Sequence, residues 1–378
     1  MSGRVFITVG EVSGDRNAAN LVRELKILRP DLIIEGFGGP AMRDAGVEIH
    51  IDTVHRAVMG LRALLRIVEV FFVQRWLRKR YRTIRPDLHV CVDSWSMNWL
   101  FARQAKLAGV KVLYYIAPQT WASRPGRVRR LRRYVEQLAC IFPFEEEWFR
   151  SRDVSAIFVG HPLFDHLAAV RPPRPAIPPD GFASRPPVLA LLPGSRSAVA
   201  RHNLPYLLDV AEIVQRQFPD AQFFIPTTSA SQPIAIAQLK RRKKLRNCQL
   251  VLDGLDDVAP RCDLAVTVSG TSTLHLASYG VPMIVIYRAS RILWELFGRW
   301  VIHARTFAMV NILSGTRIVP EFIPWFGPAK EVADAALDLL ANPQKLTAQQ
   351  QSLNALIARL DKPGASRNVA ELAMKLMG

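Results

Sequence analysis

Apolar residues in the first half of the chain fall into short β-rich runs that alternate with helical patterns. The spacing predicts helices over about 15–28 and 98–108. Strands are expected at 5–10, 33–39, 88–93, 111–118, 137–144 and 155–162. Strands that alternate with helices are typical of a parallel sheet with helices on both faces, so this half is predicted to be an α/β domain.

A proline-rich segment at 170–187 interrupts this alternation. Proline fixes φ and donates no backbone N–H, so we interpret the segment as a linker. The alternation then restarts. Strands are expected at 188–196, 221–229, 248–254, 263–270 and 282–288, a helix over about 203–217, and a helical tail after about 328.

Two doubly wound, Rossmann-like domains that face a central cleft are therefore the predicted fold. The expected divisions are a first domain, a linker, a second domain and a tail: 1–168, 169–187, 188–345 and 346–378. The tail either packs on the first domain or is exchanged between subunits, and both placements stay open. Ligands of such folds bind beyond the carboxyl ends of the strands, so function is expected in the loops there.

Positive charge is in large excess. The 378 residues include 50 Lys and Arg against 32 Asp and Glu, a net charge of +18. This balance predicts an anionic partner: nucleic acid, an acidic membrane surface or a phosphorylated substrate. The four cysteines are scattered without metal-ligand spacing, which favours a reducing, cytosolic compartment. No signal peptide and no membrane-spanning run of about 18 apolar residues is expected.

Three turns have the composition of anion-binding loops. "GEVSGD" (10–15) follows the first strand, where Gly10 and Gly14 allow close approach of a ligand and Ser13 or Asp15 can cap the helix. "LPGSR" supplies Gly194, Ser195 and Arg196, and "SGTST" supplies Ser269, Gly270 and Thr271. Backbone N–H groups at helix N-termini bind phosphates. Two such turns in one domain favour a pyrophosphate-bearing nucleotide over two structural turns, although no Walker or GxGxxG motif occurs.

Two side chains are candidates for acid–base chemistry. Asp93 ends the strand at 88–93, where a general base could meet a substrate hydroxyl, and capping of the next helix is an equally good interpretation. His161 in "FVGHPL" lies beside the domain junction, and a single histidine is more often structural.

The segment 58–82 is too apolar for an ordinary surface helix, and Lys and Arg follow its apolar part. This pattern is typical of interfacial membrane binding, the alternative being a buried helix with a solvated end. The expected membrane-associating residues are Met59, Leu64, Leu65, Val68, Phe71, Phe72 and Trp76. A second basic cluster at 124–134 suits lipid head groups or a phosphorylated substrate better than nucleic acid, since no nucleic-acid motif accompanies it.

Together these motifs resemble the lipid-A-disaccharide synthase family. "GEVSGD", "GFGGPAM", "APQTWA", "FPFE", "FVGHPL", "LLPGSR", "SGTSTL" and "NILSGTRIVPEFI" occur in the order of that family, from about residue 4 to 375. The resemblance implies a GT-B glycosyltransferase fold, with an acceptor-binding first domain and a UDP-sugar-binding second domain. It implies inverting transfer of diacylglucosamine from UDP to the 6-hydroxyl of diacylglucosamine 1-phosphate, without metal or other cofactor, at the cytoplasmic face of the bacterial inner membrane.

The resemblance also implies roles for individual residues. Asp93 would be the base and Arg196 would stabilise the leaving diphosphate. The nucleotide sugar would be bound by Gly194, Ser195, Ser269, Gly270, Thr271, His275, Asn311, Arg317 and Glu321. The acceptor would be bound by Glu11, Ser13, Gly14, Asp15, Asn98 and His161. Partners would be the two sugar lipids and an anionic membrane, with a homodimer as a further expectation.

Three positions depart from the family pattern. The family usually has Glu where this chain has His275, and it has acidic residues in place of Ser96 and Val199. A neutral imidazole accepts one hydrogen bond and a protonated one accepts none, so ribose hydroxyls would be held differently. The alternatives are therefore a diverged transferase with another acceptor, and a weakly active or non-catalytic lipid-binding relative.

Overall fold

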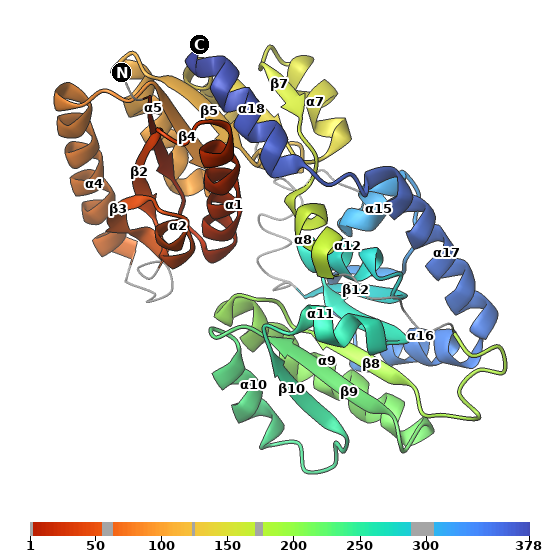
Figure 1. Ribbon diagram of the computed structural model, residues 1–378. Coiled ribbons are helices and arrows are strands. Elements are labelled where there is room, and N and C mark those ends of the chain that lie inside the picture. Colours follow the sequence, from red (N-terminus) through yellow and green to blue (C-terminus); the bar gives the residue numbers. More distant parts are fainter. Residues whose placement is uncertain (1–2, 55–62, 123–124, 171–176, 289–305) are drawn as a thin grey trace. The chain divides into compact units, whose positions relative to one another are not determined.

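The computed structural model describes residues 3–54, 63–122, 125–170, 177–288 and 306–378, without the side chains of 63–70 and 169 (Figure 1). Contacts along the chain divide it into two compact units. The first unit comprises 1–168 and 362–378, and the second comprises 169–361. Each is built on its own parallel sheet and is described separately.

The first unit has a seven-stranded parallel sheet in the order β3-β2-β1-β4-β5-β6-β7. Its strands are β1 (Arg4–Thr8), β2 (Ile33–Gly38), β3 (Glu48–Asp52), β4 (Leu88–Val92), β5 (Lys111–Tyr115), β6 (Gln137–Cys140) and β7 (Ala156–Phe158). Edge strand β3 was not predicted because its five residues, "EIHID", include three charged or titratable side chains and so form no apolar run. The expected strand at 137–144 ends at Cys140, since Pro143 opens a helix.

Helices cover both faces of this sheet, and Figure 1 shows α1 and α4 on opposite sides of it. One face packs on α4, α5, α6 and α7 through a single apolar cluster that includes Phe6, Phe37, Leu77, Phe101 and Leu131. The helices of the unit are α1 (Val12–Leu28), α2 (Pro40–Asp44), α4 (Ala63–Thr83), α5 (Trp95–Leu107), α6 (Val128–Tyr134), α7 (Pro143–Arg150), α8 (Pro162–Val170) and α18 (Ala365–Met377), with a 3-10 turn, η1, at Pro125–Arg127.

The second unit has a six-stranded parallel sheet in the order β10-β9-β8-β11-β12-β13. Its strands are β8 (Val188–Leu192), β9 (Gln222–Thr227), β10 (Cys248–Leu252), β11 (Leu264–Val268), β12 (Met283–Arg288) and β13 (Glu321–Trp325). Its helices are α9 (Ser197–Gln217), α10 (Gln232–Leu239), α11 (Leu255–Val258), α12 (Thr271–Ser278), α15 (Met309–Ser314), α16 (Ala329–Ala341) and α17 (Pro343–Leu360), with a 3-10 turn, η2, at Ala259–Arg261. Strand β13 was not predicted because it contains Pro324, a residue tolerated only at a sheet edge.

The helical tail is shared between the units, which differs from the expected division at 346. Helix α17 belongs to the second unit, where Leu346 joins the apolar core. Helix α18 belongs to the first unit and packs along α1. The carboxylate of Asp165 accepts backbone N–H groups of Gly364, Ala365 and Ser366 at 2.6–3.0 Å, so it caps α18 from almost 200 residues away.

No helix within the described parts of the chain combines the length and apolarity that crossing a bilayer would demand. The prediction of two Rossmann-like, doubly wound domains is confirmed by the two sheets.

Candidate functional site

Each sheet has one switch point. On one side of it the chain adds strands in one direction from the first strand, and on the other side it adds them in the opposite direction. In the first sheet the switch point lies between β1 and β4, and in the second between β8 and β11. Ligands of doubly wound sheets bind beyond the carboxyl ends of these strands. The loops there carry Gly10–Asp15 and Asp93 in the first unit, and Gly194–Arg196 and Ser269–Thr271 in the second. The sequence motifs thus fall at the two topologically expected places.

The turn after β4 holds Asp93 in an uncommon backbone conformation. Asp93 and Ser94 have φ of 51° and 45°, in the left-handed region that non-glycine residues seldom adopt. The Asp93 carbonyl accepts hydrogen bonds from Asn98 Nδ2 at 2.9 Å and from the Tyr114 hydroxyl at 2.6 Å. The residue at the cap of α5 is Ser94, not Asp93. The turn is therefore held by hydrogen bonds to the main chain of Asp93, and these bonds leave its partly exposed side chain out of the fixing contacts.

Asn98, expected among the acceptor-binding residues, is fully buried and has a structural role in the described fold. Its Nδ2 donates to the carbonyls of Thr8, Val92 and Asp93, and its Oδ1 accepts from the Thr8 hydroxyl at 2.8 Å. It joins the ends of β1 and β4 at the switch point. Asn98 thereby positions the turn that carries Asp93.

A buried hydrogen-bond chain extends from Asn98 through the sheet to α4. Since Thr8 donates to Asn98, its oxygen accepts from His89 Nε2 at 3.0 Å. His89 Nδ1 then accepts from the Tyr81 hydroxyl at 2.6 Å. Burial lowers the pKa of His89 to about 3, so the ring is neutral with its proton on Nε2. The base candidate's turn and α4 are thus tied by one satisfied polar network.

Asp15, also expected among the acceptor-binding residues, forms a structural cap. It is 3% exposed, and its two carboxylate oxygens accept N–H groups of Gly39, Ala41 and Met42 at 2.8–3.3 Å. This carboxylate stabilises the N-terminus of α2. Glu11 and Ser13 remain at the surface of the same turn, while Gly14 is buried beneath it.

His161 is buried in an aromatic environment. Its ring lies 5.2 Å from that of Phe142 and 6.1 Å from that of Phe164, centroid to centroid. Its Nδ1 accepts the backbone N–H of Leu163 at 3.1 Å. These contacts place the His161 ring in the aromatic packing at the start of α8, and its contact with an acceptor stays a prediction.

The LPGSR turn opens the long helix α9. Gly194 has φ of +99°, and a Cβ there would lie 2.7 Å from Val199 Cγ1, so this position requires glycine. The carbonyl of Ser195 accepts the Thr228 hydroxyl, and the Ser197 hydroxyl donates to the Ala230 carbonyl, both at 2.8 Å. No side chain caps α9. Its N-terminus therefore presents backbone N–H groups beside the exposed Arg196, an arrangement suited to a phosphate.

The SGTST turn opens α12 and also has no side-chain cap. The Ser269 hydroxyl donates to the Phe307 carbonyl at 2.7 Å, and the Thr273 hydroxyl to the Gly270 carbonyl at 2.8 Å. Gly270 and Thr271 are exposed, and a Cβ at Gly270 would meet no atom within 4 Å. The backbone of Gly270 is extended, a conformation that any residue adopts. Glycine at this position therefore provides space for a ligand.

His275 is paired with an acidic residue that sequence reasoning missed. Its Nε2 lies 2.6 Å from Asp256 Oδ1, which also accepts the Tyr279 hydroxyl at 2.8 Å. The rings of His275 and Tyr279 stack at 5.8 Å. The position where the family usually has Glu therefore retains a carboxylate nearby, supplied by α11. Tyr279 could have been found one helical turn after His275, whereas no local signal indicated Asp256.

Asn311 and Glu321 hydrogen-bond to each other and to the backbone around them as an internal clamp, and their contact with the nucleotide stays a prediction. Asn311 is 1% exposed, and its Oδ1 accepts N–H groups of Ile318 and Val319. Glu321 accepts Asn311 Nδ2 at 2.6 Å and the N–H groups of Phe307 and Ala308. Arg317 is exposed and donates to the Glu321 carbonyl at 3.0 Å. The clamp holds the segment that contacts Ser269.

Glu145, from the FPFE motif, is a buried carboxylate outside the predicted set. It accepts Trp121 Nε1 at 3.0 Å and the N–H groups of Ile141 and Phe142. Burial raises its pKa to about 7 although all three donors favour the ionised form. It ties the APQTWA loop after β5 to α7, so two motifs of the family pattern have a structural role.

The expected membrane segment is only partly described. Met59 lies outside the described residues, as do the side chains of Leu64, Leu65 and Val68. Phe71 and Phe72 are 63% and 62% exposed. The partly buried Trp76 ring lies 4.9 Å from that of His50 and 5.4 Å from that of Phe37. Exposed aromatic side chains on α4 are what a membrane-binding helix requires.

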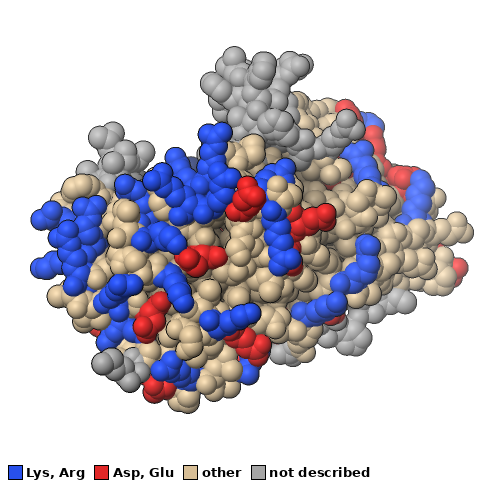
Figure 2. All heavy atoms as spheres, turned by 90° about the horizontal axis from the view of Figure 1, so that it is seen from above, with Lys and Arg blue, Asp and Glu red and all other residues tan. Residues whose placement is uncertain are grey.

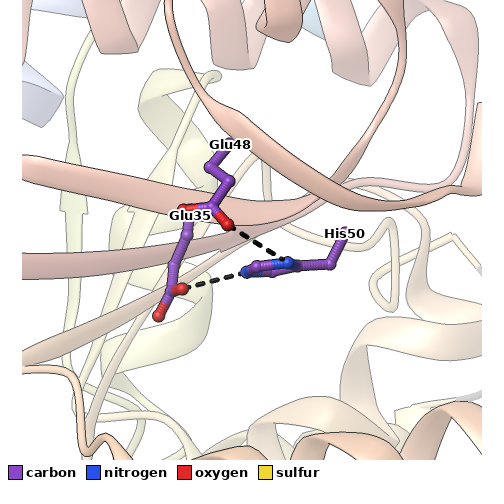
Figure 3. Close-up of side chains that lie close together, drawn as sticks. All are labelled: Glu35, Glu48 and His50. Atoms are coloured by element: carbon purple, nitrogen blue, oxygen red, sulfur yellow. Dashed lines mark hydrogen bonds and ion pairs between the residues drawn. The ribbon is translucent and has the colours of Figure 1, made fainter.

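Within the described residues, Glu35, Glu48 and His50 form a cluster of three metal-ligand types (Figure 3). Figure 3 shows the imidazole between the carboxylates, with Nε2 2.9 Å from Glu35 and Nδ1 3.7 Å from Glu48. Arg80 also pairs with Glu35. Burial opposes ionisation of Glu35, but hydrogen bonds from Arg80 and His50 outweigh it and lower its pKa. With one ring nitrogen turned to each carboxylate and a guanidinium on Glu35, this is an ion-pair chain anchoring α4.

Comparison with known proteins agrees with this geometry. The family model of lipid-A-disaccharide synthetase matches residues 5–376. The chain belongs to this family. The lipid-A-disaccharide synthase of Geobacter metallireducens is 36% identical over 376 residues, covering 99% of this chain and 97% of that protein. The resemblance to the family seen in the sequence is thus confirmed, and the chain is a glycosyltransferase.

Solved structures with low identity share the fold. The kitacinnamycin glycotransferase superposes with a TM-score of 0.64 at 15% identity, and each chain is covered fully. A structure of S. aureus MnaA with UDP has a TM-score of 0.66 at 13% identity, covering 100% of this chain and 98% of that one. These likenesses confirm the GT-B fold expected from sequence.

Proposed function

We propose that the chain transfers 2,3-diacylglucosamine from UDP to the 6-hydroxyl of 2,3-diacylglucosamine 1-phosphate, forming the β-1,6-linked disaccharide and UDP. The observation that carries this assignment is that the two switch points offer different chemical groups. The second unit has two uncapped helix N-termini there, and the first has a carboxylate on a fixed turn. Membership of the lipid-A-disaccharide synthase family supports the identity of the substrates.

The donor diphosphate is assigned to the second unit. The N-termini of α9 and α12 carry partial positive charge, and Arg196 adds a full one. As the bond between the sugar and UDP breaks, negative charge builds on the diphosphate. Preorganised N–H donors and a guanidinium stabilise that charge more in the transition state than in the substrate. S. aureus MnaA, which has the same fold, was solved with UDP, and this supports nucleotide binding by a protein of this fold.

The acceptor and the base are assigned to the first unit. The acceptor's 6-oxygen attacks the anomeric carbon, its proton passes to the carboxylate of Asp93, and UDP leaves with the electron pair of the broken bond. Attack opposite the leaving group inverts the anomeric centre, which requires a single base. The hydrogen bonds from Asn98 and Tyr114 to the Asp93 carbonyl orient that base.

Both substrates are acylated, so the enzyme is assigned to a membrane surface as a peripheral protein. The exposed Phe71 and Phe72 of α4 support this assignment. The cytoplasmic face of the inner membrane is the proposed location, as the resemblance to the family implies.

The test is a transfer assay in mixed micelles with UDP-2,3-diacylglucosamine and 2,3-diacylglucosamine 1-phosphate, following both UDP and disaccharide. Asp93→Asn and Arg196→Ala are each expected to lower kcat by about 10²–10⁴. Asp44→Asn, on the surface of α2, and Arg216→Ala, in the last turn of α9, are matched controls expected to keep wild-type rates.

Full activity in Asp93→Asn would remove Asp93 as the base. Absence of disaccharide with wild-type protein that still binds the UDP-sugar would point to a different acceptor. Absence of both product and UDP-sugar binding would leave a non-catalytic relative.

A further inference from the structure

The second basic segment of the sequence folds into the short helix α6, whose outer side is formed by arginines. Val128 and Leu131 are buried in the core of the first unit. Arg129, Arg130, Arg132 and Arg133 are exposed and, with Tyr134, line a hollow of about 590 Å³. A hollow bordered by four guanidinium groups is a concentrated positive field that attracts anions.

The charge of this arginine hollow is poorly compensated. Among the described residues, the ion pair of α6 joins Arg132 to Asp153 at 3.2 Å, and the Asp153 side chain is 82% exposed. Exposed ion pairs of this kind contribute little free energy, so Asp153 offsets little of the positive charge. Four like charges within seven residues repel one another, so an anion that enters the hollow relieves that repulsion as well as forming its own contacts.

Two of the arginines are oriented before any ligand arrives. The Arg130 guanidinium lies 4.1 Å from the centre of the Trp99 ring of α5, and that of Arg133 lies 5.6 Å from the Tyr134 ring. Stacking uses the face of a guanidinium and leaves its in-plane N–H groups to form bidentate bonds with phosphate. Preorganisation lowers the entropy that binding would otherwise cost.

The arginine hollow belongs to the same helical layer as the exposed phenylalanines of α4. Helix α5 contacts both α4 and α6, and all three contribute to one apolar cluster on one face of the sheet. Phe71 and Phe72 project from the outer side of α4. Figure 2 shows Lys and Arg gathered at the side of the first unit where α4 lies in Figure 1. Apolar anchors and phosphate-binding arginines in one layer are the combination that interfacial binding uses.

We propose that the arginine hollow of α6 is a docking surface for the phosphate groups of anionic phospholipids, working together with Phe71 and Phe72. The inference rests on the proposed membrane role of the enzyme. A bilayer fits better than one soluble phosphate, because the four guanidinium groups are spread over an open, exposed surface. All four guanidinium groups can bind phosphate at the same time only when a surface presents many phosphates.

The test is sedimentation of the full chain with vesicles of phosphatidylcholine alone and of phosphatidylcholine mixed with phosphatidylglycerol, at low and high salt. The triple variant Arg129→Gln, Arg130→Gln, Arg133→Gln is compared with the wild type. An arginine near an anionic surface is worth about a fivefold change in partitioning, so three should weaken binding to the anionic vesicles on the order of a hundredfold. Binding to phosphatidylcholine alone should change little.

The matched control is Arg241→Gln, Lys243→Gln, Lys244→Gln, which removes the same charge from exposed positions of the second unit. It is expected to lose far less than the α6 variant. A third protein, Arg129→Lys, Arg130→Lys, Arg133→Lys, keeps the charge and loses the planar guanidinium groups. It should bind between the wild type and the Gln variant.

Equal losses in the α6 variant and the control would reduce the effect to net charge and overturn the proposal. So would a raised KM for the phosphorylated acceptor in neutral detergent with unchanged vesicle binding, since the hollow would then hold substrate. Wild-type protein that binds neither kind of vesicle would overturn the peripheral membrane role itself. Wild-type binding that survives the α6 substitutions but is lost in Phe71→Ser, Phe72→Ser would overturn only the arginine hollow.

Discussion

The side-chain nitrogen of Asn98 lies 2.9 Å from the carbonyl oxygen of Asp93, a residue it supports without touching the carboxylate. The two side chains therefore have separable roles, chemistry for Asp93 and geometry for Asn98. The buried network gives Asn98 a positioning role for the turn that carries Asp93.

Replacing Asn98 with Ala should destabilise the first unit by about 3 kcal/mol or more, because buried groups of Thr8, Val92 and Asp93 would lose their partner at about 1–3 kcal/mol each. It should also lower kcat. Asp93→Asn should lower kcat with almost no loss of stability, since the turn is held through the main chain. Denaturant unfolding alongside the transfer assay measures both. Unchanged unfolding of Asn98→Ala would contradict the positioning role.

His275→Glu, which introduces the usual family residue, should weaken rather than improve UDP binding. The new carboxylate would face Asp256, now 2.6 Å from the imidazole, and two like charges at that distance repel. We expect a loss of about 1 kcal/mol in stability, kept small because both side chains are partly solvated. The double variant with Asp256→Asn should recover both properties. Calorimetric titration with UDP and thermal unfolding are the measurements, and a single variant that binds as well as the double would refute the coupling.

Gly194→Ala and Gly270→Ala should separate backbone strain from ligand contact. At Gly194 a Cβ meets Val199 and φ is +99°, so the variant should lose about 1–3 kcal/mol of stability. At Gly270 the space is open, so stability should be kept while UDP binding falls, because the Cβ would occupy the place of the diphosphate. Unimpaired UDP binding by a well-folded Gly270→Ala protein would argue against a diphosphate at α12.

Acid should destabilise the first unit through His89. Its folded pKa of about 3 lies below the ordinary value near 6.5, so the unfolded chain binds more protons between these limits. Stability is therefore complete above about pH 6.5 and falls by up to about 1.4 kcal/mol per pH unit on acidification. Unfolding of wild type and His89→Gln from pH 7 to pH 4 should show a shallower slope in the variant. His202→Gln, at an exposed position, is the control, and equal slopes in all three proteins would count against a buried neutral His89.

Local pattern was enough for most of the architecture. Apolar runs and helical spacing predicted the central strands of both sheets because buried parallel strands are continuously apolar. The edge strands β3 and β13 were missed for the same reason: half-exposed, polar or proline-containing segments carry no such signal. The turns at Gly194 and Ser269 were identifiable because helix N-termini after strands have a characteristic composition.

The sequence by itself thus determined the fold class, the family and the loops where chemistry is expected, since these depend on residues close together in the chain. Only the tertiary structure decided which groups of the chain Asp15, Asn98, His161, Asn311 and Glu321 contact. Asp15 caps a helix some 24 residues away and Asn98 bonds a strand 90 residues away. The role of a polar side chain depends on the group it contacts, and contacts between residues far apart in the chain produce no pattern in the sequence. His275 is the clearest case: the histidine was visible in the sequence, and Asp256 became its partner only when α11 and α12 were packed together.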